Sequence, residues 1–463
     1  MDFDEYSFAD LLSNIVDNRG KTCPVEDEGF PLIATNCIKD DSLYPVFEKV
    51  RFVSDDTYKN WFRGHPNAGD IIFVCKGSPG RVAWVKEPVS FCIAQDMVAI
   101  RADQRVVDPM FLFSLLRSEQ VINKINNMHV GTLIPHFKKG DFKNLYLSIP
   151  RNMKLQRAIG LFYFSLSEKI EKNKEINQTL EQMAQALFKS WFVDFEPVKA
   201  KMAALEAGGS QEDATLAAMT AISGKDADAL AFFEREHPEQ YAELKATAEL
   251  FPSAMQDSEL GKIPEGWSIK PLDGIATYQN GLALQKFRPE NENDFLPVVK
   301  IAQLKKGFSD GEEKASPNIK PECIIDNGDV VFSWSDSLMV DIWCGGQAAL
   351  NQHLFKVSST KYPKWLYYKY TAHHLIEFQR IAEAKAVTMG HIKREHLSQA
   401  KCLIPSSETI CAFTPFFEPV LNRVISNRLE SRKLENLRDT LLPKLLSGEI
   451  TLPEAEQIIS EEA

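Results

Sequence analysis

A long amphipathic stretch at residues 166–191 constrains this chain more than any other feature. Its apolar and small residues recur at alternating spacings of three and four, with Glu, Lys and Gln between them, as in a helix that packs along another helix. Residues 420–445 repeat the pattern after a shift of 254 positions. The aligned seam positions are Leu166, Ile170, Asn173, Leu180, Leu187 and Trp191 in the first stretch and Val420, Val424, Asn427, Leu434, Leu441 and Leu445 in the second. Because an isolated helix cannot bury its apolar stripe, we predict that the two stretches are long helices that pair as an antiparallel coiled coil.

The polar residues on this seam bear on whether the two stretches are a true repeat. Asn173 and Asn427 occupy equivalent positions, whereas Ala184 and Arg438 are a mismatch. Two unrelated core helices are the alternative, and the matched asparagines count against it. Because a buried asparagine fixes the register of paired helices at a cost in stability, we hypothesise that these asparagines set the register here.

The repeat extends into the segments that precede each long helix. Residues 69–84 read GDIIFVCKGSPGRVAW and align without a gap with residues 328–343, GDVVFSWSDSLMVDIW. Each begins with a Gly-Asp turn, in which Asp is expected to bond the backbone two residues on. A polar tip then separates two apolar runs, so each segment is predicted to form a hairpin or strand–loop–strand unit. Further matched segments are residues 93–100 with 350–357 and residues 136–139 with 391–394.

These repeats predict an α+β fold in which two α/β globular regions alternate with two long helices as an internal pseudo-repeat. The length of 463 residues leaves room for two to four domains. The predicted boundaries are residues 1–150 for the first globular region, 151–196 for the central long helix, 197–263 for a helical spacer or insertion, 264–405 for the second globular region, 406–450 for the distal long helix and 451–463 for an acidic tail.

The net charge of -11 argues against a nucleic-acid ligand only at first sight. Residues 197–266 hold about 13 acids and 6 bases, and residues 449–463 hold about 5 acids and no base. The rest of the chain is therefore close to neutral and can carry local basic patches that face DNA.

The sequence lacks signatures of export, membrane insertion and catalysis. The eight cysteines show no CxxC spacing, as expected of reduced thiols in a cytoplasmic protein. No apolar run is long enough to cross a membrane, and the N-terminal residues have no signal-peptide core. We find no phosphate loop, GxGxxG, HExxH, GxSxG or Asn-Pro-Pro-aromatic motif. His353, His373 and His374 lack ligand spacing, so we expect no metal site and no enzyme activity.

The chain as a whole resembles the DNA specificity subunit of type I restriction–modification systems. Residues 180–195 (LEQMAQALFKSWFVDF), followed by a spacer and IPEGW, resemble the central region of that family. Residues 437–450 (LRDTLLPKLLSGEI) resemble its distal end. The likeness covers nearly the whole chain, and the long spacer at 197–260 is the one departure from the family pattern.

The resemblance implies a function without catalysis. The two globular regions would be α/β target recognition domains, each entering the major groove over one half of a split target. The paired helices would be a spacer that fixes the distance between half-sites; a 26-residue helix is about 39 Å long, close to the roughly 34 Å of one DNA turn. They would also dock two adenine methyltransferase subunits, through which motor–nuclease subunits join. S-adenosylmethionine and ATP with Mg would belong to those partners, so this chain is expected to hold no cofactor.

Polar residues in three loops of each globular region are the candidates for DNA contact, because phosphate contacts position a protein and base-edge contacts specify the sequence. In the first region they are Arg19, Lys21, Thr22, Lys76, Ser78, Gly80, Arg81, His136, Lys138 and Lys139. In the second they are Gln285, Lys286, Ser335, Asp336, Ser337, His391, Lys393 and Arg394. Ordinary exposed loops would have the same composition, so that interpretation stays open.

The two hairpin tips differ although their flanking residues match. The basic tip KGSPGR and the acidic tip SDSLMV cannot present the same hydrogen-bond donors and acceptors. We therefore predict that the two halves read different sequences, which makes the target asymmetric. Two other classes remain open: a DNA-binding adaptor or regulator of this architecture that serves no active methyltransferase, and an enzyme with an unfamiliar site. Copurification with a methyltransferase would separate the first from the main hypothesis.

Overall fold

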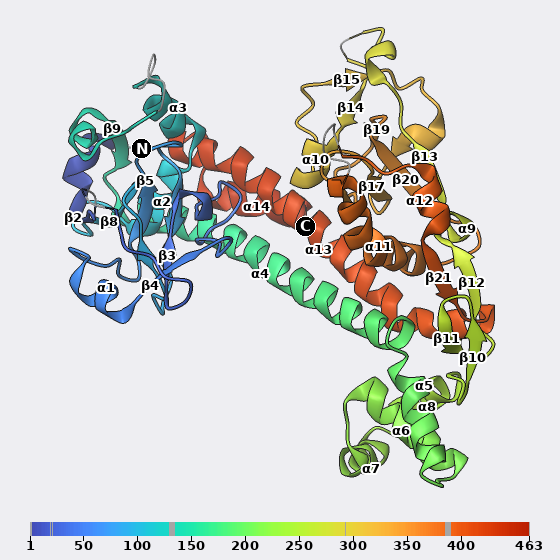
Figure 1. The fold of residues 1–463 in the computed structure, drawn as a ribbon. Coiled ribbons are helices and arrows are strands. Elements are labelled where there is room, and N and C mark those ends of the chain that lie inside the picture. The colour runs from blue at the N-terminus through green and yellow to red at the C-terminus, as the bar shows by residue number, and fades with distance from the viewer. Residues whose placement is uncertain are drawn as a thin grey trace. The chain divides into compact units, whose positions relative to one another are not determined.

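The computed structural model describes residues 2–18, 20, 22–128, 135–291, 293–384 and 390–462. The chain divides into two compact units, Met1–Glu175 with Glu430–Ala463 (unit 1) and Ile176–Leu429 (unit 2). The long helices α4 (Met153–Phe192) and α13 (Ser407–Ser447) each contribute residues to both units (Figure 1). Among the described residues, no helix combines the length and the apolar character that a membrane span requires.

Unit 1 is built around a four-stranded antiparallel sheet in the order β2-β8-β5-β6. A smaller sheet, β4-β3-β7, pairs β3 with β7 in parallel, and β1 pairs with β9. The strands are β1 (Phe3–Ser7), β2 (Leu12–Val16), β3 (Phe30–Ile33), β4 (Arg51–Val53), β5 (Ile71–Val74), β6 (Val82–Trp84), β7 (Cys92–Ile93), β8 (Met97–Ala102) and β9 (Tyr146–Pro150). The helices are α1 (Asp55–Asn60), α2 (Pro109–Leu116), α3 (Glu119–Asn127) and the 3-10 turns η1 (Phe8–Leu11), η2 (Thr35–Cys37) and η3 (Lys139–Asn144).

Unit 2 repeats this plan with the four-stranded sheet β13-β20-β17-β18. Its second sheet, β15-β14-β19-β16, again holds one parallel pair, and β12 pairs with β21. The strands are β12 (Ser268–Pro271), β13 (Thr277–Asn280), β14 (Leu296–Val299), β15 (Lys314–Ala315), β16 (Ile324–Ile325), β17 (Val330–Ser333), β18 (Met339–Ile342), β19 (Ala348–Leu350), β20 (Leu354–Ser358) and β21 (Lys401–Ile404). The helices are α9 (Leu272–Ile275), α10 (Ile301–Lys306), α11 (Lys364–Ala384), α12 (Arg394–Gln399) and the 3-10 turns η4 (Leu284–Lys286) and η5 (Pro321–Cys323).

The predicted hairpins are confirmed as β5–β6 and β17–β18. Their first strands, β5 and β17, are fully buried on both faces, and alternate side chains of a strand point to opposite sides of the sheet. Ile71 and Phe73 join a core cluster with α2 and the long helices, whereas Ile72 and Val74 join a separate cluster beneath the smaller sheet. The repeat is therefore one of strand order and layering as well as of sequence.

The Gly-Asp pair that opens each hairpin is a turn closed by its carboxylate. Gly69 and Gly328 have φ of 85° and 88°, the region that favours glycine. Asp70 is 1% exposed and holds Arg101 through two contacts of 2.7 and 2.9 Å. It also accepts from the N–H of Asn67 at 2.8 Å. The carboxylate thus bonds a residue three positions earlier, so the expectation of a bond two residues later was wrong.

The long helices pair antiparallel, as predicted. In unit 1, Asn173 donates to Glu430 (2.8 Å) and Ser431 (3.3 Å). In unit 2, Asn427 donates to Asn177 at 2.8 Å, and Asn177 donates to the Val424 carbonyl at 3.3 Å. The shift of 254 positions that relates the helices carries the first contact onto the second. Most seam residues are buried, and Leu180, Leu187, Val420 and Leu434 are half-buried.

Capping side chains explain where the long helices begin. The Asn152 side chain accepts from the backbone N–H groups of Lys154 (3.0 Å) and Leu155 (3.3 Å) at the start of α4. Ser406 accepts from the N–H of Thr409 at 3.1 Å at the start of α13. Such caps satisfy N–H groups that have no partner within a helix.

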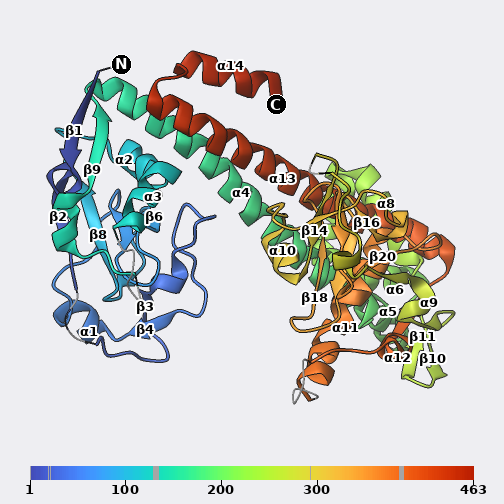
Figure 2. The same ribbon diagram turned by 90° about the horizontal axis from the view of Figure 1, so that it is seen from above.

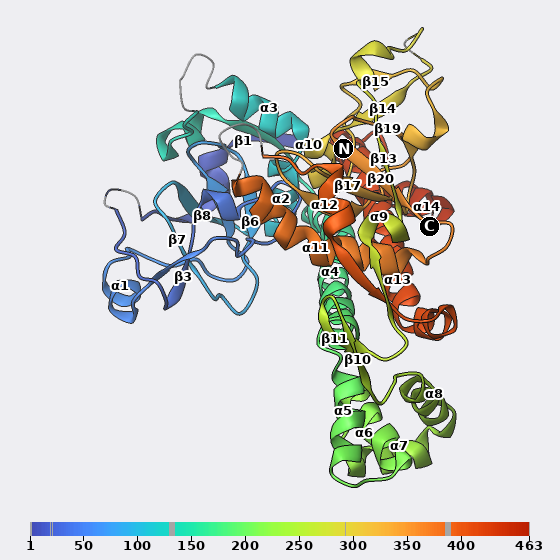
Figure 3. The same ribbon diagram turned by 45° about the vertical axis from the view of Figure 1, so that its right-hand side comes forward.

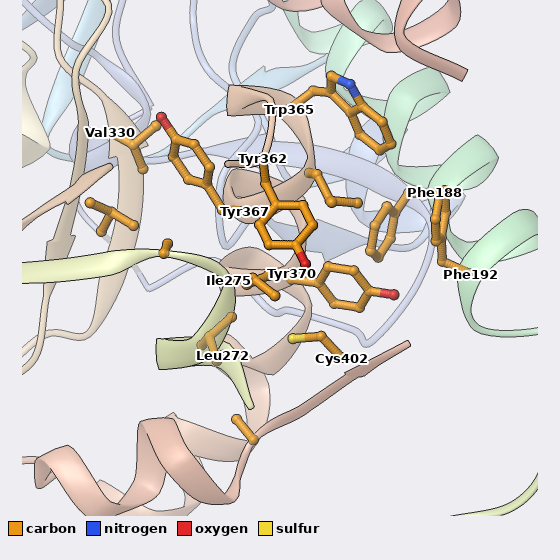
Figure 4. Close-up of a cluster of buried hydrophobic side chains, with 14 of the residues drawn as sticks. Phe188, Phe192, Leu272, Ile275, Val330, Tyr362, Trp365, Tyr367, Tyr370 and Cys402 are labelled. Atoms are coloured by element: carbon orange, nitrogen blue, oxygen red, sulfur yellow. The ribbon is translucent and has the colours of Figure 1, made fainter. Parts of the chain in front are cut away.

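The core of unit 2 joins the long helices to its sheet through aromatic side chains. Phe188 and Phe192 of α4 point toward Trp365 and Tyr370 of α11 (Figure 4). Trp365 stacks on Phe417 of α13 with ring centroids 4.4 Å apart. Each long helix therefore packs against the globular region and against its partner helix at once.

His374 lies within this packing. Its Nε2 is 3.0 Å from the Lys401 carbonyl, and burial lowers the pKa of His374 to about 4. It is therefore a neutral core residue near pH 7.

The spacer folds into helices α5 (Glu196–Glu206), α6 (Gln211–Ser223), α7 (Ala227–Glu236) and α8 (Pro238–Glu249), followed by the hairpin of β10 (Met255–Ser258) and β11 (Gly261–Pro264). Helices α6, α7 and α8 gather around a small core that includes Met219, Leu230 and Leu244, and α5 packs against α6 (Figure 3). Lys201 is buried, donates to the Phe251 carbonyl at 2.6 Å, and has a pKa lowered by that burial. The spacer is thus a packed helical bundle.

The predicted acidic tail is a helix, α14 (Leu452–Glu462), that lies near the end of α13 (Figure 2). Ala455 is fully buried in the main core cluster of unit 1, and Leu452, Ile458 and Ile459 pack against that cluster. One apolar face is therefore covered, while Glu454, Glu456 and Glu461 are exposed.

Removing the charge of Asp70 tests the role of the turn carboxylate. Asp70→Asn keeps the side-chain shape but leaves Arg101 without its anion. Breaking a largely buried pair costs several kcal/mol, and partial exposure of Arg101 reduces this. We expect unit 1 to lose about 2 kcal/mol of unfolding free energy in urea titration. The matched control Asp4→Asn, whose partner Arg151 is 63% exposed, should lose less than about 1 kcal/mol. Equal losses would contradict this role.

A double-mutant cycle tests the polar contact in the seam of unit 2. Asn427→Leu leaves the buried Asn177 oxygen without its donor, which costs about 1–3 kcal/mol. Asn177→Leu with Asn427→Leu removes both polar groups and should recover most of that loss in thermal or urea unfolding. Additive losses would show that the two asparagines do not act as a pair.

Candidate nucleic-acid interface

Three loops meet in unit 1 at the backbone of Cys75, just after β5. The Cys75 N–H donates to the Asp96 carbonyl at 2.9 Å, in the turn between β7 and β8. The Cys75 carbonyl accepts from the N–H of Phe137 at 2.8 Å. Gly77 donates to the Pro135 carbonyl at 3.1 Å, which completes a bridge between Lys76 and His136. We call this arrangement the three-loop junction.

Unit 2 forms the same junction at Trp334, after β17. The Trp334 N–H donates to the His353 carbonyl at 3.4 Å, and its carbonyl accepts from Ile392 at 3.0 Å. The backbone N–H of Asp336 donates to the Gly390 carbonyl at 2.9 Å, and Ser335 and His391 form an isolated antiparallel β-bridge. The hydrogen bonds of one junction thus match those of the other, bond for bond.

The bend of the hairpin tip is also repeated. Gly77 has φ of 89°, and Asp336 at the equivalent position has φ of 58°. Left-handed backbone is rare for residues other than Gly, Asn and Asp. Two different residues therefore hold the same bend, and the side chains around it can change without loss of the backbone form.

The structure places many of the predicted contact residues on the surface of these loops. The exposed ones are Thr22, Lys76, Lys138, Lys139, Gln285, Lys286, Asp336, Lys393 and Arg394, and the half-buried ones are Ser78, Arg81, His136, Ser337 and His391. Arg19 and Lys21 lie outside the described residues. The hairpin tip and the His loop, predicted separately, are brought together in both units.

Two predicted contact residues are corrected by their burial. A Cβ on Gly80 would lie 3.1 Å from the Ile125 side chain, and its φ is 93°, so Gly80 shapes the tip. Ser335 is 6% exposed, and its hydroxyl lies 3.1 Å from Nδ1 of His353. Both residues are therefore buried within the tip, contrary to the expectation that they lie on its surface. Sequence alone could not reveal this, because burial of a tip residue depends on neighbouring loops.

Two predicted arginines already have protein partners. Arg81 pairs with Asp40 at 3.1 Å. Arg394 donates to the Tyr278 carbonyl at 3.2 Å and lies over the Phe355 ring. Each guanidinium group therefore has some of its N–H donors engaged within the protein, whereas Lys138 and Lys139 are exposed next to the junction.

The loops after β2 and β13 hold the remaining predicted residues. In unit 2, the Leu282 carbonyl accepts from the N–H of Gln352 at 2.9 Å, and Gln285 and Lys286 follow three and four residues later in η4. This loop therefore borders the junction. Thr22 lies in the corresponding loop of unit 1, after β2.

The third loop of each junction was not among the contact residues predicted from the sequence. It carries Gln95 and Asp96 in unit 1 and Gln352 and His353 in unit 2. The signal was present in the matched segments 93–100 and 350–357, which align the two glutamines. The apolar residues of these segments indicate strands, and only the hydrogen bonds at Cys75 and Trp334 place the segments beside the tips.

The duplicated architecture agrees with comparison to known proteins. The family model described as "Type I restriction modification DNA specificity domain" matches residues 23–182 and 264–431, once in each half. The chain belongs to this family of DNA specificity subunits. The two matched ranges contain the residues that form both three-loop junctions.

Individual relatives support the same membership. The chain is similar to the type I restriction enzyme HindI specificity subunit of Haemophilus influenzae, with 30% identity over 82% of this chain and 86% of the relative. It is 24% identical to the MjaIX specificity subunit of Methanocaldococcus jannaschii over 83% of this chain and 78% of that protein. A crystal structure of the type I S subunit from M. genitalium shares the fold, with a TM-score of 0.51 at 13% identity over 96% of both chains.

The exposed lysines beside the junction of unit 1 give a salt-dependent prediction. Each lysine that neutralises a phosphate contributes about 0.9 to the slope of log affinity against log salt. We expect Lys138→Ala with Lys139→Ala to flatten that slope by about 2, and to weaken target and random DNA about equally. Fluorescence anisotropy with labelled DNA duplexes measures both quantities. The control Lys59→Ala, on α1, should leave the slope unchanged, and an unaltered slope in the double variant would contradict phosphate contact.

Proposed function

We propose that this chain is the DNA-reading subunit of a type I restriction–modification complex and that it recognises an asymmetric target in two parts. The observation that carries the proposal is the duplicated junction, with one backbone form and two sets of side chains. Unit 1 offers Lys76, Lys138 and Lys139, whereas unit 2 offers Asp336 with Lys393. Lys favours guanine or phosphate and Asp favours cytosine, so different half-sites are expected.

The paired helices are proposed as the element that sets the spacing of the half-sites. α4 has 40 residues, about 60 Å at 1.5 Å per residue, and both helices contribute to both units. The asparagine contacts, repeated at equivalent seam positions, support a fixed register.

The same helices are proposed to dock two methyltransferase subunits, through which motor–nuclease subunits join. Exposed apolar side chains on α4, Leu161 (49%) and Met183 (60%), support a role in contacting partners. In this proposal the chain is not catalytic and holds no cofactor, while S-adenosylmethionine and ATP with Mg serve the partners. Its place of action is the cytoplasm.

A methylation map of the host genome, with and without this gene, tests the proposal. We expect an adenine-methylated, two-part asymmetric motif to disappear on deletion and to return with the gene on a plasmid. Long-read sequencing reports the motif and its spacing directly. The control is a second methylation motif of the same host, which should persist.

The proposal is overturned if deletion removes no methylation motif although the gene and its neighbouring methyltransferase are expressed. An adaptor or regulator without an active methyltransferase would then be the better description. For the register, Asn173→Leu should alter the spacing of the motif or the assembly of the complex, and an unchanged motif in an unchanged complex would contradict it.

A further inference from the structure

We propose that Gln352, held by a relay through His353 and Ser335, reads an A·T base pair in the half-site of unit 2. The inference rests on the proposed function and deepens it by naming a specificity residue that motif reasoning did not supply. Gln352 is exposed at the junction, on the turn between β19 and β20.

The relay begins at a buried hydroxyl. Ser335 Oγ lies 3.1 Å from Nδ1 of His353, and Nε2 of His353 lies 3.4 Å from the side-chain nitrogen of Gln352. An amide nitrogen can only donate, so Nε2 must be the acceptor. A neutral imidazole with an acceptor at Nε2 carries its proton at Nδ1 and donates it to Ser335. One tautomer thus satisfies both contacts.

The imidazole is held in place from several directions. The His353 ring lies against Trp334, with centroids 5.7 Å apart. The backbone N–H of His353 donates to the side-chain oxygen of Asn351 at 3.2 Å, and the backbone carbonyl of His353 accepts from the backbone N–H of Trp334. The backbone N–H of Gln352 is tied to the Leu282 carbonyl at 2.9 Å. A long side chain on such a support loses less rotamer entropy when it binds, because part of that loss is already incurred.

The remaining groups of Gln352 match adenine. The side chain has two N–H donors and one carbonyl oxygen, and the relay uses one donor. One N–H and the oxygen remain, which is the pair that binds N7 and the N6 amino group of adenine in the major groove. The relay thus orients the amide without using the groups that read the base.

Unit 1 supplies a natural comparison. Gln95 occupies the equivalent position, but Asp96 stands in place of His353 and Lys76 in place of Ser335. Neither the imidazole nor the hydroxyl of the relay is present there. Any role of Gln95 would concern the other half-site and would not depend on such a relay.

The test is the methylation motif written by the complete complex in a host without other adenine methylation. We expect Gln352→Ala to relax one A·T position of one half-site, with its preference over other bases falling about tenfold or more, while the other half-site is unchanged. His353→Ala should relax the same position less strongly. Ser335→Thr, which keeps the hydroxyl, should preserve the preference better than Ser335→Ala.

Two controls separate a loss of base reading from a loss of assembly. Gln95→Ala must leave the position read by Gln352 intact, and copurification of each variant with the methyltransferase checks assembly. The inference is overturned if an assembled Gln352→Ala complex writes the wild-type motif, if the relaxed position is a G·C pair, or if both half-sites relax together. In each of these cases the wild-type complex still writes a methylation motif, so the proposed function is unaffected. If the wild-type complex writes no motif, the proposed function itself is refuted.

Discussion

The mutual burial of two apolar seams is the interaction on which the rest of the structure depends. Neither α4 nor α13 can bury its stripe alone, and each is completed by a partner more than 200 residues away in the sequence. In unit 1, Leu441 and Leu445 lie in the same cluster as Phe73 of the sheet. In unit 2, Trp191 packs on Phe413 and Phe417. The helix pair and the globular regions therefore share their cores.

Polar contacts within the seams add specificity to this burial. A purely apolar seam can slide by a turn at little cost, whereas a misplaced buried asparagine loses hydrogen bonds worth about 1–3 kcal/mol. The contacts of Asn173 with Ser431 and of Asn427 with Asn177 are equivalent in the repeat. Each unit thus has a polar contact at the same position of the repeat, with Ser431 as the acceptor in unit 1 and Asn177 in unit 2.

The two junctions likewise share their backbone geometry while their side chains differ. Their hydrogen bonds involve only backbone atoms, so Cys75 and Trp334, or Gly77 and Asp336, can serve at the same place. Side chains around a shared backbone frame can then differ, which suits a member of a family of DNA specificity subunits. The Ser335–His353–Gln352 relay is one such variation, built on a frame that unit 1 also has.

The sequence by itself determined the repeat, the two hairpins, the antiparallel helix pair and most of the exposed loop residues. These follow from local periodicity and from the alignment of the chain with itself, which require no knowledge of distant contacts. Tertiary structure decided that Gln95 and Gln352 lie beside the hairpin tips, that Ser335 is buried and that Arg394 is engaged by Tyr278 and Phe355. Burial and loop adjacency depend on which segments meet in space, and the pattern of a single segment does not contain that information.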